Sequence, residues 1–349
     1  MTKPVGIGLV GAGAYGEFCL AAFSQMPEVS IAAVADVNHE RAQQLADQYH
    51  ARAYPNLEGL LNDADVEVVA LNTPPNLHAP QGLAALNAGK HLFCEKPLAL
   101  TVEDAQKLID TANAKGLRLT VDYVMRQNPF WAFAASLAHS GVLGTLRHMD
   151  LANHAAGLSL PANHWFWNPA LSGGIWIEHG VHFFDAFAWV AGGEGQILGS
   201  AAYQHGDGAT DRVECLARYG DAAAHFYHGF DQSSQTEQTT VTLTFEQGYV
   251  TLREWVPTSI EVLTPVDDTL WSNLLPRTVE YTTLDDGRRL ARAYAPEGKS
   301  VVYTRAIQDG MRQLAAAVRD PQASLTVTGE QGLASLRMAV ATTSLASDK

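Results

Sequence analysis

Two ionisable side chains four residues apart mark a place where protons could be moved. Glu178 and His182 stand at i and i+4, and Asp185 follows at i+7. On a helix, all three would lie on one face. Histidine exchanges protons near neutral pH, so His182 could accept the proton of a substrate hydroxyl or donate one to a carbonyl. Glu178 could bind the substrate or tune His182, and His179 is either a packing residue or a substrate contact.

A metal site is the alternative interpretation of this segment. A carboxylate and an imidazole at i and i+4 can bind zinc, but Glu178-His179-x-x-His182 lacks the His-Glu-x-x-His order of zinc proteases. The chain also has three widely separated cysteines: Cys19, Cys94 and Cys215. Their spacing fits neither a zinc site nor a redox motif, so we expect reduced, structural thiols and no metal.

A glycine-rich segment near the N-terminus predicts a phosphate-binding turn. Gly11-Ala12-Gly13-Ala14-Tyr15-Gly16 follows the apolar run Val5–Val10 and opens a helical pattern. In a dinucleotide-binding turn, the first glycine permits the tight bend and the second lets the pyrophosphate approach the backbone. The third lets the helix pack against the strand, and N–H groups at the helix start bind the phosphate. The alternative is a glycine-rich turn without a ligand.

Asp36 favours the dinucleotide interpretation. It ends the second apolar run, 20 positions after Gly16. A carboxylate there accepts hydrogen bonds from the ribose 2′-hydroxyl of NAD and repels the 2′-phosphate of NADP. No arginine follows among residues 37–39, so we expect NAD, with NADP as the less favoured cofactor. Asp36 could also cap the next helix.

Lys96 is the third candidate for chemistry. It follows the apolar run His91–Cys94, at what would be the ligand-binding edge of a sheet. Beside a nicotinamide, its ammonium could hold a substrate oxygen and stabilise the alkoxide that precedes hydride transfer. Glu95 could orient it as an ion-pair partner. The alternative is a surface lysine in a loop.

The first third of the chain alternates apolar runs with helical patterns. The runs are Val5–Val10, Val29–Ala35, 66–71, His91–Cys94 and 117–121, and the helices lie between them at 15–26, 39–50, 77–88 and Val102–Ala114. This alternation indicates βαβ units and a parallel sheet covered on both faces. We therefore predict a doubly wound α/β Rossmann domain over residues 1–123.

Beyond residue 123 the pattern changes. Helices are predicted at 129–139, 174–190, 301–319 and 331–345, and strands follow one another from 195 to 263, among them 240–245 and 249–255. Strands without intervening helices indicate a mostly antiparallel sheet. We therefore predict an α+β C-terminal domain over residues 124–349, with a large, mostly antiparallel open sheet.

Composition narrows the choice of partners. The 349 residues include 37 acidic and 23 basic side chains, for a formal net charge of −14. Such a field repels phosphate backbones and anionic lipids, so we expect neither nucleic acid nor a membrane as partner. The nearest approach to a basic cluster, Arg288, Arg289 and Arg292, is typical of a solvated surface. The chain has no apolar stretch of about 20 residues and no secretory pattern, so we expect a cytoplasmic protein.

Three further segments carry a family resemblance. They are Asn72-Thr73-Pro74-Pro75-Asn76-Leu77-His78, Cys94-Glu95-Lys96-Pro97 and Gly173-Gly174-Ile175-Trp176-Ile177-Glu178-His179-Gly180-Val181-His182-Phe183-Phe184-Asp185. In this order, at the ends of predicted elements, they resemble the glucose–fructose oxidoreductase / inositol dehydrogenase / rhizopine-catabolism (Gfo/Idh/MocA) family. The last segment, 326–347, is similar as well, so the resemblance covers nearly the whole chain.

The resemblance implies an NAD(P)-dependent dehydrogenase or reductase acting on a sugar, an inositol or a related small hydroxyl or carbonyl compound. It implies catalytic roles for Lys96, His182 and Glu178, and a cis bond before Pro97. The implied cofactor contacts are Gly11, Gly13, Ala14, Tyr15, Gly16, Asp36, Asn72, Thr73, Pro74, Asn76, His78, Glu95 and Lys96. The implied second domain binds substrate and forms a homodimer or homotetramer through its sheet. For 74–78, the alternative is that the prolines end a strand and Asn76 caps a helix.

The predicted substrate contacts are Lys96, Tyr123, Arg126, Trp165, Glu178, His179 and His182. Trp165 lies in an aromatic and polar stretch, Asn163, His164, Trp165, Trp167 and Asn168. Rings flanked by hydrogen-bonding groups suit a polyhydroxylated ligand, although tryptophans also fill space between domains. Arg126 could bind a carboxylate or tie the domains together.

Two departures from the family pattern bear on the site. Glu178 stands where the family usually has aspartate, and Ile175 where it often has a third glycine. The extra methylene of glutamate adds about 1.5 Å of reach, whereas sites tolerate displacements of only about 0.5 Å. These departures leave open a non-catalytic dinucleotide-binding regulator as the alternative to a dehydrogenase. A further alternative is another enzyme on the same scaffold, a glycosidase that uses NAD as a redox intermediate.

Overall fold

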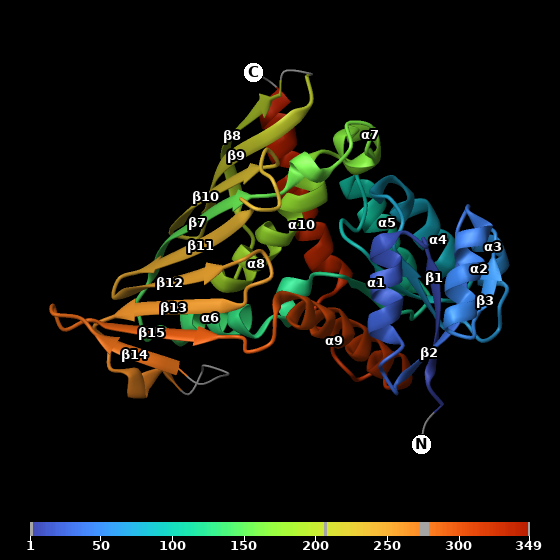
Figure 1. Cartoon of the computed structure of the whole chain (residues 1–349), viewed down its shortest axis with the longest axis horizontal. Coiled ribbons are helices and arrows are strands. Elements are labelled where there is room, and N and C mark those ends of the chain that lie inside the picture. The colour runs from blue at the N-terminus through green and yellow to red at the C-terminus, as the bar shows by residue number, and fades with distance from the viewer. Residues whose placement is uncertain (1–2, 206–207, 273–278, 348–349) are drawn as a thin grey trace. The chain divides into compact units, whose positions relative to one another are not determined.

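The computed structural model describes residues 3–205, 208–272 and 279–347. The chain forms two compact units (Figure 1). The first comprises Met1–Val124, Ala170–Gly173 and Thr304–Leu336, and the second comprises Met125–Pro169, Gly174–Tyr303 and Arg337–Lys349. Part of the C-terminal segment thus belongs to the first unit by packing. The functional division at residue 123 stays a prediction.

The first unit contains a parallel six-stranded sheet in the order β3-β2-β1-β4-β5-β6. Its strands are β1 (Val5–Val10), β2 (Val29–Ala35), β3 (Arg52–Tyr54), β4 (Val68–Leu71), β5 (His91–Cys94) and β6 (Leu119–Val121). Every residue of β1 and β4 is buried, as expected of strands covered on both faces. The predicted doubly wound α/β fold is confirmed. The strand order reverses between β1 and β4, the place where such sheets bind ligands.

Helices follow the strands of the first unit. They are α1 (Ala14–Phe23), α2 (His39–Gln48), α3 (Leu57–Leu61), the 3₁₀ turn η1 (Pro75–Leu77), α4 (His78–Asn87) and α5 (Val102–Ala114). Asn38, Asn56 and Thr101 begin three of them, each accepting a backbone N–H three residues on. The later segment joins this unit through Thr120, whose Oγ1 donates to the carbonyl of Val327 at 2.8 Å.

The second unit is built on a nine-stranded sheet in the order β14-β15-β13-β12-β11-β7-β10-β9-β8. Its strands are β7 (Leu146–His154), β8 (Gln196–Gln204), β9 (Thr210–Tyr219), β10 (Ala222–Gly229), β11 (Gln238–Phe245), β12 (Gly248–Arg253), β13 (Ser259–Thr264), β14 (Val279–Thr283) and β15 (Arg289–Tyr294). Only the β7–β10 pair among them is parallel, which confirms the predicted mostly antiparallel sheet.

Helices cover one face of this sheet (Figure 1). They include α6 (Pro129–Ser140) and α8 (Val181–Ala191). Short helical turns connect other elements: η2 (Val124–Gln127), η3 (Gly157–Ser159), η4 (Trp165–Trp167), α7 (Pro169–Ser172) and η6 (Asp268–Leu270). The ring of Phe187 in α8 lies 4.5 Å from that of Phe226 in β10. Two long helices, α9 (Lys299–Arg319) and α10 (Gly329–Ser347), each contribute residues to both units.

The segment predicted as one helix over 174–190 is divided. Gly173 and Gly174 have positive φ angles of 80° and 84°, which keep the chain out of a helix there. A π-helical turn, η5 (Trp176–Gly180), then precedes α8. A π turn holds more residues than an α turn, so Glu178 and His182 do not have the regular i, i+4 relation that the sequence suggested.

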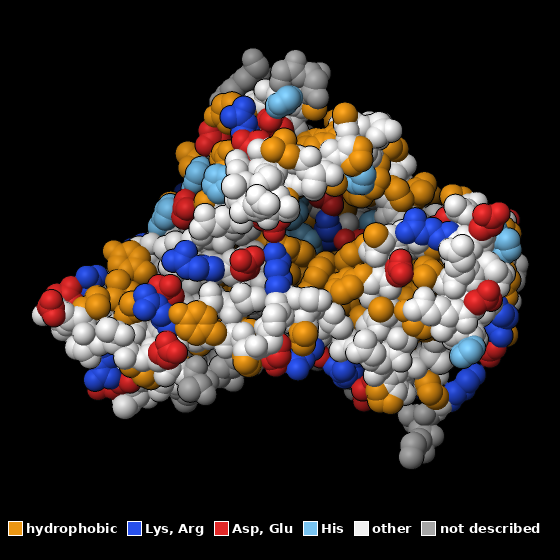
Figure 2. Space-filling model, viewed as in Figure 1, with side chains coloured by type: hydrophobic (Ala, Val, Ile, Leu, Met, Phe, Trp, Pro, Cys, Tyr) orange, Lys and Arg blue, Asp and Glu red, His pale blue; other side chains and the backbone are white. Residues whose placement is uncertain are grey.

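The surface carries both signs of charge. On the face in Figure 2, acidic and basic side chains are interspersed, without a broad patch of one sign. Within the described residues, every helix is too short or too polar to span a lipid bilayer.

Candidate functional site

The glycine turn after β1 has the shape needed for a pyrophosphate. A Cβ at Gly11, where φ is 98°, would lie 2.6 Å from the carbonyl oxygen of Asn72, and one at Gly16 would lie 2.0 Å from that of Gly11. Only glycine fits at either position. At Gly13, in contrast, an added Cβ would meet no atom within 4 Å. The space beside the start of α1 is therefore open, and the residues fit a bound dinucleotide phosphate.

Asp36 ties this turn to the second strand. Its Oδ2 accepts the backbone N–H of Ala12 at 2.7 Å, and its Oδ1 accepts that of Asn38 at 2.7 Å. A carboxylate oxygen can accept a second hydrogen bond, so ribose hydroxyls could still bind here. The cap of α2 is Asn38, not Asp36. The neighbouring Val37 is 97% exposed and carries no charge that would attract a 2′-phosphate.

The turn after β4 contains buried acceptors. The side-chain Oδ1 atoms of Asn72 and Asn76 are buried and, within the described residues, receive no hydrogen bond. Asn76 does not cap α4, whose N-cap is Leu77 without a side-chain bond. Thr73 donates its hydroxyl to Oε1 of Gln81 at 2.7 Å. Two unsatisfied amide oxygens at a ligand-binding edge fit a hydrogen-bonding ligand such as a nucleotide.

His78 connects two turns at this edge of the sheet. It is 1% exposed, with Nδ1 2.6 Å from the carbonyl oxygen of Pro97 and Nε2 2.8 Å from that of Thr73. Its ring therefore fixes the turn after β4 to the turn that carries Lys96. This placement supports a structural role, and direct contact of His78 with the cofactor stays a prediction.

Lys96 lies in the turn after β5, beside carboxylates. Its Nζ is 3.9 Å from Oε1 of Glu95, and the two side chains are 11% and 16% exposed. The Lys96–Pro97 peptide bond is cis, as the resemblance implied.

Asp122 is a member of this region that the sequence analysis missed. It follows β6, is 4% exposed, and accepts the hydroxyl of Tyr15 on its Oδ2 at 2.8 Å. Burial raises the pKa of its carboxyl to about 6, against the opposing effects of the Tyr15 hydroxyl and the charge of Lys96. The signal available in the sequence was an acidic residue directly after an apolar run.

The second unit places His182 in an aromatic cluster. His182 and Glu178 are buried, at 3% and 9% exposure. The His182 ring lies 5.9 Å from that of His179 and 5.8 Å from that of Trp255. His179 also packs against Phe230 at 5.3 Å. The two histidines thus share one largely aromatic environment.

His228 is a second residue that the sequence analysis missed. It is fully buried, its ring lies 5.4 Å from that of His179, and its Nδ1 is 3.2 Å from Nδ2 of Asn153. Burial lowers the pKa of His228 well below its ordinary value, and His179 adds to this effect. His228 is therefore neutral at physiological pH and extends the cluster with a polar edge. His228 lies on β10, far along the chain from α8, so no local sequence pattern could show that it contacts the cluster around His179.

The predicted aromatic contact Trp165 joins the same cluster indirectly. Trp165 is partly exposed in η4, and its ring lies 6.5 Å from that of Phe166. Phe166 in turn packs 4.7 Å from Phe230, which contacts His179. A row of rings therefore leads from η4 to the histidines.

Tyr123 and Arg126 are both engaged by the protein. Tyr123 is 1% exposed, with its hydroxyl 2.5 Å from that of Ser335, a placement that does not support substrate contact. Arg126 donates from Nε and Nη2 to the two carboxylate oxygens of Asp185 at 2.8 and 2.9 Å. It also lies over the ring of Trp189 at 5.3 Å. Arg126 therefore ties η2 to α8, and its role as a substrate contact stays a prediction.

Removing Arg126 is expected to destabilise the protein strongly. Asp185 is 2% exposed, and burial raises the pKa of its carboxyl while Arg126 opposes that rise. Arg126→Met would leave this carboxylate without its partner, at a cost of about 3–5 kcal/mol in the free energy of unfolding. Urea denaturation measures this change in the free energy of unfolding. Arg147→Met, which removes a half-exposed arginine, serves as a control with an expected change below about 1 kcal/mol. Equal losses of unfolding free energy in the two variants would contradict a stabilising role for the Arg126–Asp185 ion pair.

Among the residues that the structure describes, no three histidine, cysteine, aspartate or glutamate side chains gather as metal ligands. The three cysteines are free and buried.

Comparison with known proteins supports one family. Residues 5–123 match the oxidoreductase family model with an NAD-binding Rossmann fold, GFO_IDH_MocA, and residues 131–251 match the GFO/IDH/MocA C-terminal domain. The uncharacterized oxidoreductase YrbE of Bacillus subtilis is 24% identical over 293 residues, 82% of this chain and 79% of that protein. Inositol 2-dehydrogenase of Salmonella typhimurium is 36% identical over 141 residues, 39% of this chain and 42% of that protein.

Solved structures share the fold over the whole chain. Levoglucosan dehydrogenase in complex with NADH and levoglucosan superposes with a TM-score of 0.84 at 18% identity, over 99% of this chain and 98% of that one. Aldose-aldose oxidoreductase from Caulobacter crescentus, complexed with glycerol, gives a TM-score of 0.81 at 21% identity, over 99% and 98%. With its glycine turn, its two sheets and both matching models, the chain belongs to the GFO/IDH/MocA family of NAD-binding oxidoreductases.

Proposed function

We propose that this protein transfers a hydride between NAD and the hydroxyl or carbonyl carbon of a sugar, an inositol or a related small compound. One observation carries the proposal. The open glycine turn follows β1, the unsatisfied amides Asn72 and Asn76 follow β4, and Lys96 follows β5, and these three strands are neighbours in one parallel sheet. A cofactor cradle and an ammonium group therefore share one sheet edge.

The chain's own groups divide the work in this proposal. NAD, when bound, supplies the hydride acceptor or donor. The Lys96 ammonium binds the substrate oxygen and stabilises negative charge on it. His182 takes the hydroxyl proton during oxidation or returns it during reduction. Glu178, which stands where the family usually has aspartate, binds the substrate or orients His182.

Two features support the choice of NAD over NADP. Asp36 presents a carboxylate where the 2′-phosphate of NADP would lie, and Val37, exposed beside it, offers no positive charge. Two solved relatives, levoglucosan dehydrogenase and GenD2, are complexes with NADH and NAD.

The cluster around His179 supports the proposed substrate class. Aromatic faces at Trp255 and Phe230, with imidazole edges from His179 and His182, suit a ligand that has C–H faces and a hydroxyl rim. Relatives named for inositol, levoglucosan and aldose substrates agree with a polyhydroxylated ligand.

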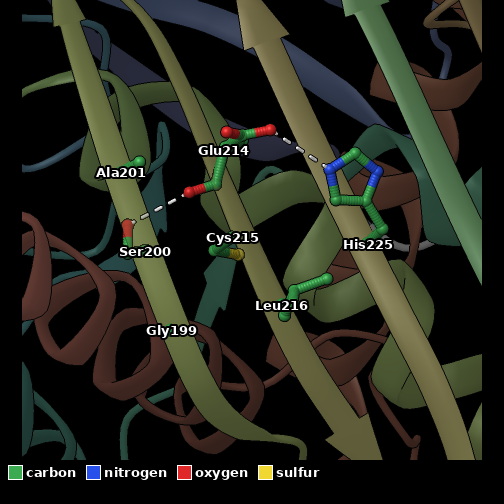
Figure 3. A pocket seen from close by; sticks show the side chains of 7 residues that line it. All are labelled: Gly199, Ser200, Ala201, Glu214, Cys215, Leu216 and His225. Atoms are coloured by element: carbon green, nitrogen blue, oxygen red, sulfur yellow. Dashed lines mark hydrogen bonds and ion pairs between the residues drawn. The ribbon is translucent and has the colours of Figure 1, made fainter.

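We also propose that a second copy of the chain covers the outer face of the nine-stranded sheet, in a homodimer or homotetramer. Leu198 and Leu216 are 58% and 55% exposed on strands β8 and β9. Beside them lies a cavity of about 300 Å³, lined by Gly199, Ser200, Ala201, Glu214, Cys215, Leu216 and His225 (Figure 3). Light scattering of the purified protein measures the number of subunits.

A screen of nicotinamide reduction tests the proposed function. Sugars, inositols and hydroxy acids are each mixed with the protein and NAD, then with NADP, and absorbance of the reduced nicotinamide is followed. We expect turnover with at least one polyhydroxylated compound and a higher kcat/KM with NAD. NAD binding without reduction of any compound would favour the regulator. Net hydrolysis of a glycoside without reduced NAD would favour the glycosidase.

A further inference from the structure

A buried carboxylate links the glycine turn to the turn that carries Lys96. Asp122 accepts the Tyr15 hydroxyl, which comes from the first turn of α1, at 2.8 Å. Its backbone N–H donates to the carbonyl of Cys94, two residues before Lys96, at 2.8 Å. Asp122 is 4% exposed, and its side chain is bonded to α1 while its backbone is bonded to the end of β5.

Asp122 interacts with side chains from two neighbouring elements. Tyr15 and Cys19 come from α1, and Cys94 and Lys96 come from the end of β5, with Glu95 between them in the sequence. Burial raises the pKa of both thiols, and the charges of Asp122 and Glu95 add to this, so the cysteines are neutral. Among these side chains, Lys96 carries the positive charge, and it lies close enough to favour ionised Asp122.

A purely structural role would be served better by another residue. The Tyr15 hydroxyl needs an acceptor, and the amide oxygen of an asparagine would supply one in the same place. A buried carboxylate instead carries a desolvation cost, visible in a carboxyl pKa of about 6. What aspartate has and asparagine lacks is the negative charge.

We propose that Asp122, held by Tyr15, is a positioning residue that keeps the Lys96 amine protonated and in place, and so joins the cofactor turn to the catalytic lysine. This inference rests on the proposed role of Lys96. Oε1 of Glu95 lies 3.9 Å from the Lys96 ammonium, the Asp122 carboxylate attracts that ammonium from the end of the neighbouring strand β6, and Tyr15 favours the charged form of Asp122 by its hydrogen bond.

The proposal predicts opposite changes in two variants. Asp122→Asn removes the charge that favours the ammonium, so the alkaline limb of the kcat/KM profile for oxidation moves to lower pH. Tyr15→Phe removes the hydrogen bond that favours the carboxylate, so Asp122 gains its proton at higher pH. The acid limb of the profile for carbonyl reduction, in which His182 starts protonated, therefore moves to higher pH. A merely structural role would lower activity at all pH values without moving either limb.

A labelling experiment tests the pairing without turnover. Only the neutral amine reacts with acetic anhydride, so peptide mass spectrometry can follow acylation of Lys96 in the full chain against pH. At a fixed pH below the midpoint, Asp122→Asn is expected to raise the rate at Lys96 by about tenfold. Lys107 on α5, which is 63% exposed, should react equally in both proteins and serves as the internal control.

The outcomes separate this inference from the proposed function. Unchanged Lys96 labelling in Asp122→Asn would overturn the inference, even if Lys96 proves essential for turnover. Changed labelling together with normal turnover of Lys96→Ala would leave the pairing intact and overturn the proposed function, and with it the catalytic purpose of the pairing. If Asp122→Asn does not fold, Tyr15→Phe decides: an acid limb that stays in place contradicts the inference.

Discussion

Replacing Lys96 with alanine is expected to lower kcat by about 10²- to 10³-fold. At the end of β5, the Lys96 ammonium lies 3.9 Å from Oε1 of Glu95, a group of opposite charge that cannot replace it. Charge developing on the substrate oxygen would then face a carboxylate without a compensating cation. Steady-state kinetics at saturating NAD, with the substrate found in the screen, measures the loss.

NAD binding should survive the same substitution. The glycine turn and Asp36 make their contacts at β1 and β2, away from Lys96 in the sheet order. The Kd for NAD, measured by calorimetry, is therefore expected to change only a few-fold. Lys107→Ala, which removes an exposed lysine paired with Asp104, is the matched control and should retain full turnover. Turnover of Lys96→Ala within a few-fold of the unaltered protein would contradict the assignment.

Replacing His182 with alanine is expected to lower kcat by about 10²- to 10⁴-fold, the usual contribution of a general acid or base. His182 is 3% exposed within the cluster of His179 and Trp255, so its removal leaves a small cavity in an apolar environment. Added imidazole should therefore restore part of the rate, because a free base can enter where the ring was. Rescue distinguishes a lost proton acceptor from a misfolded domain.

The control for His182 uses a histidine at the surface. His50 is exposed and has a φ of 55°, a conformation that asparagine adopts readily. His50→Asn should keep normal kcat and show no response to imidazole. If His182→Ala also kept normal kcat, another group would have to carry the proton, and the role assigned to His182 would be wrong.

The first unit could be predicted closely because its information is local. Strands of a parallel sheet are rich in apolar residues, so the runs Val5–Val10, Val29–Ala35 and His91–Cys94 coincide with β1, β2 and β5. The glycine turn can be predicted from residue type, since the backbone leaves no room for a side chain at Gly11 or Gly16. The order of the nine strands in the second unit could not be predicted in this way, because pairs such as β7 with β10 join segments about 75 residues apart.

The parts of the site that escaped prediction depend on contacts between distant segments. Asp122 and Tyr15 are separated by 107 residues, and His228 meets His179 only because β10 and η5 pack together. Regular α-helical spacing also does not predict the π turn at Trp176–Gly180, so the sequence could not show how Glu178 and His182 are placed along the helix. Arg126 and Asp185, two separate candidates in the sequence, are one ion pair.

Isotope transfer under single-turnover conditions tests whether the protein transfers a hydride to NAD beside Lys96. The protein, saturated with NAD, is mixed with the identified substrate deuterated at the carbinol carbon, and the nicotinamide is analysed by mass spectrometry. We predict reduced NAD that carries the deuterium, formed by the unaltered protein and not by Lys96→Ala. Substrate conversion that leaves NAD unreduced, or reduced NAD that carries no deuterium, would contradict the account.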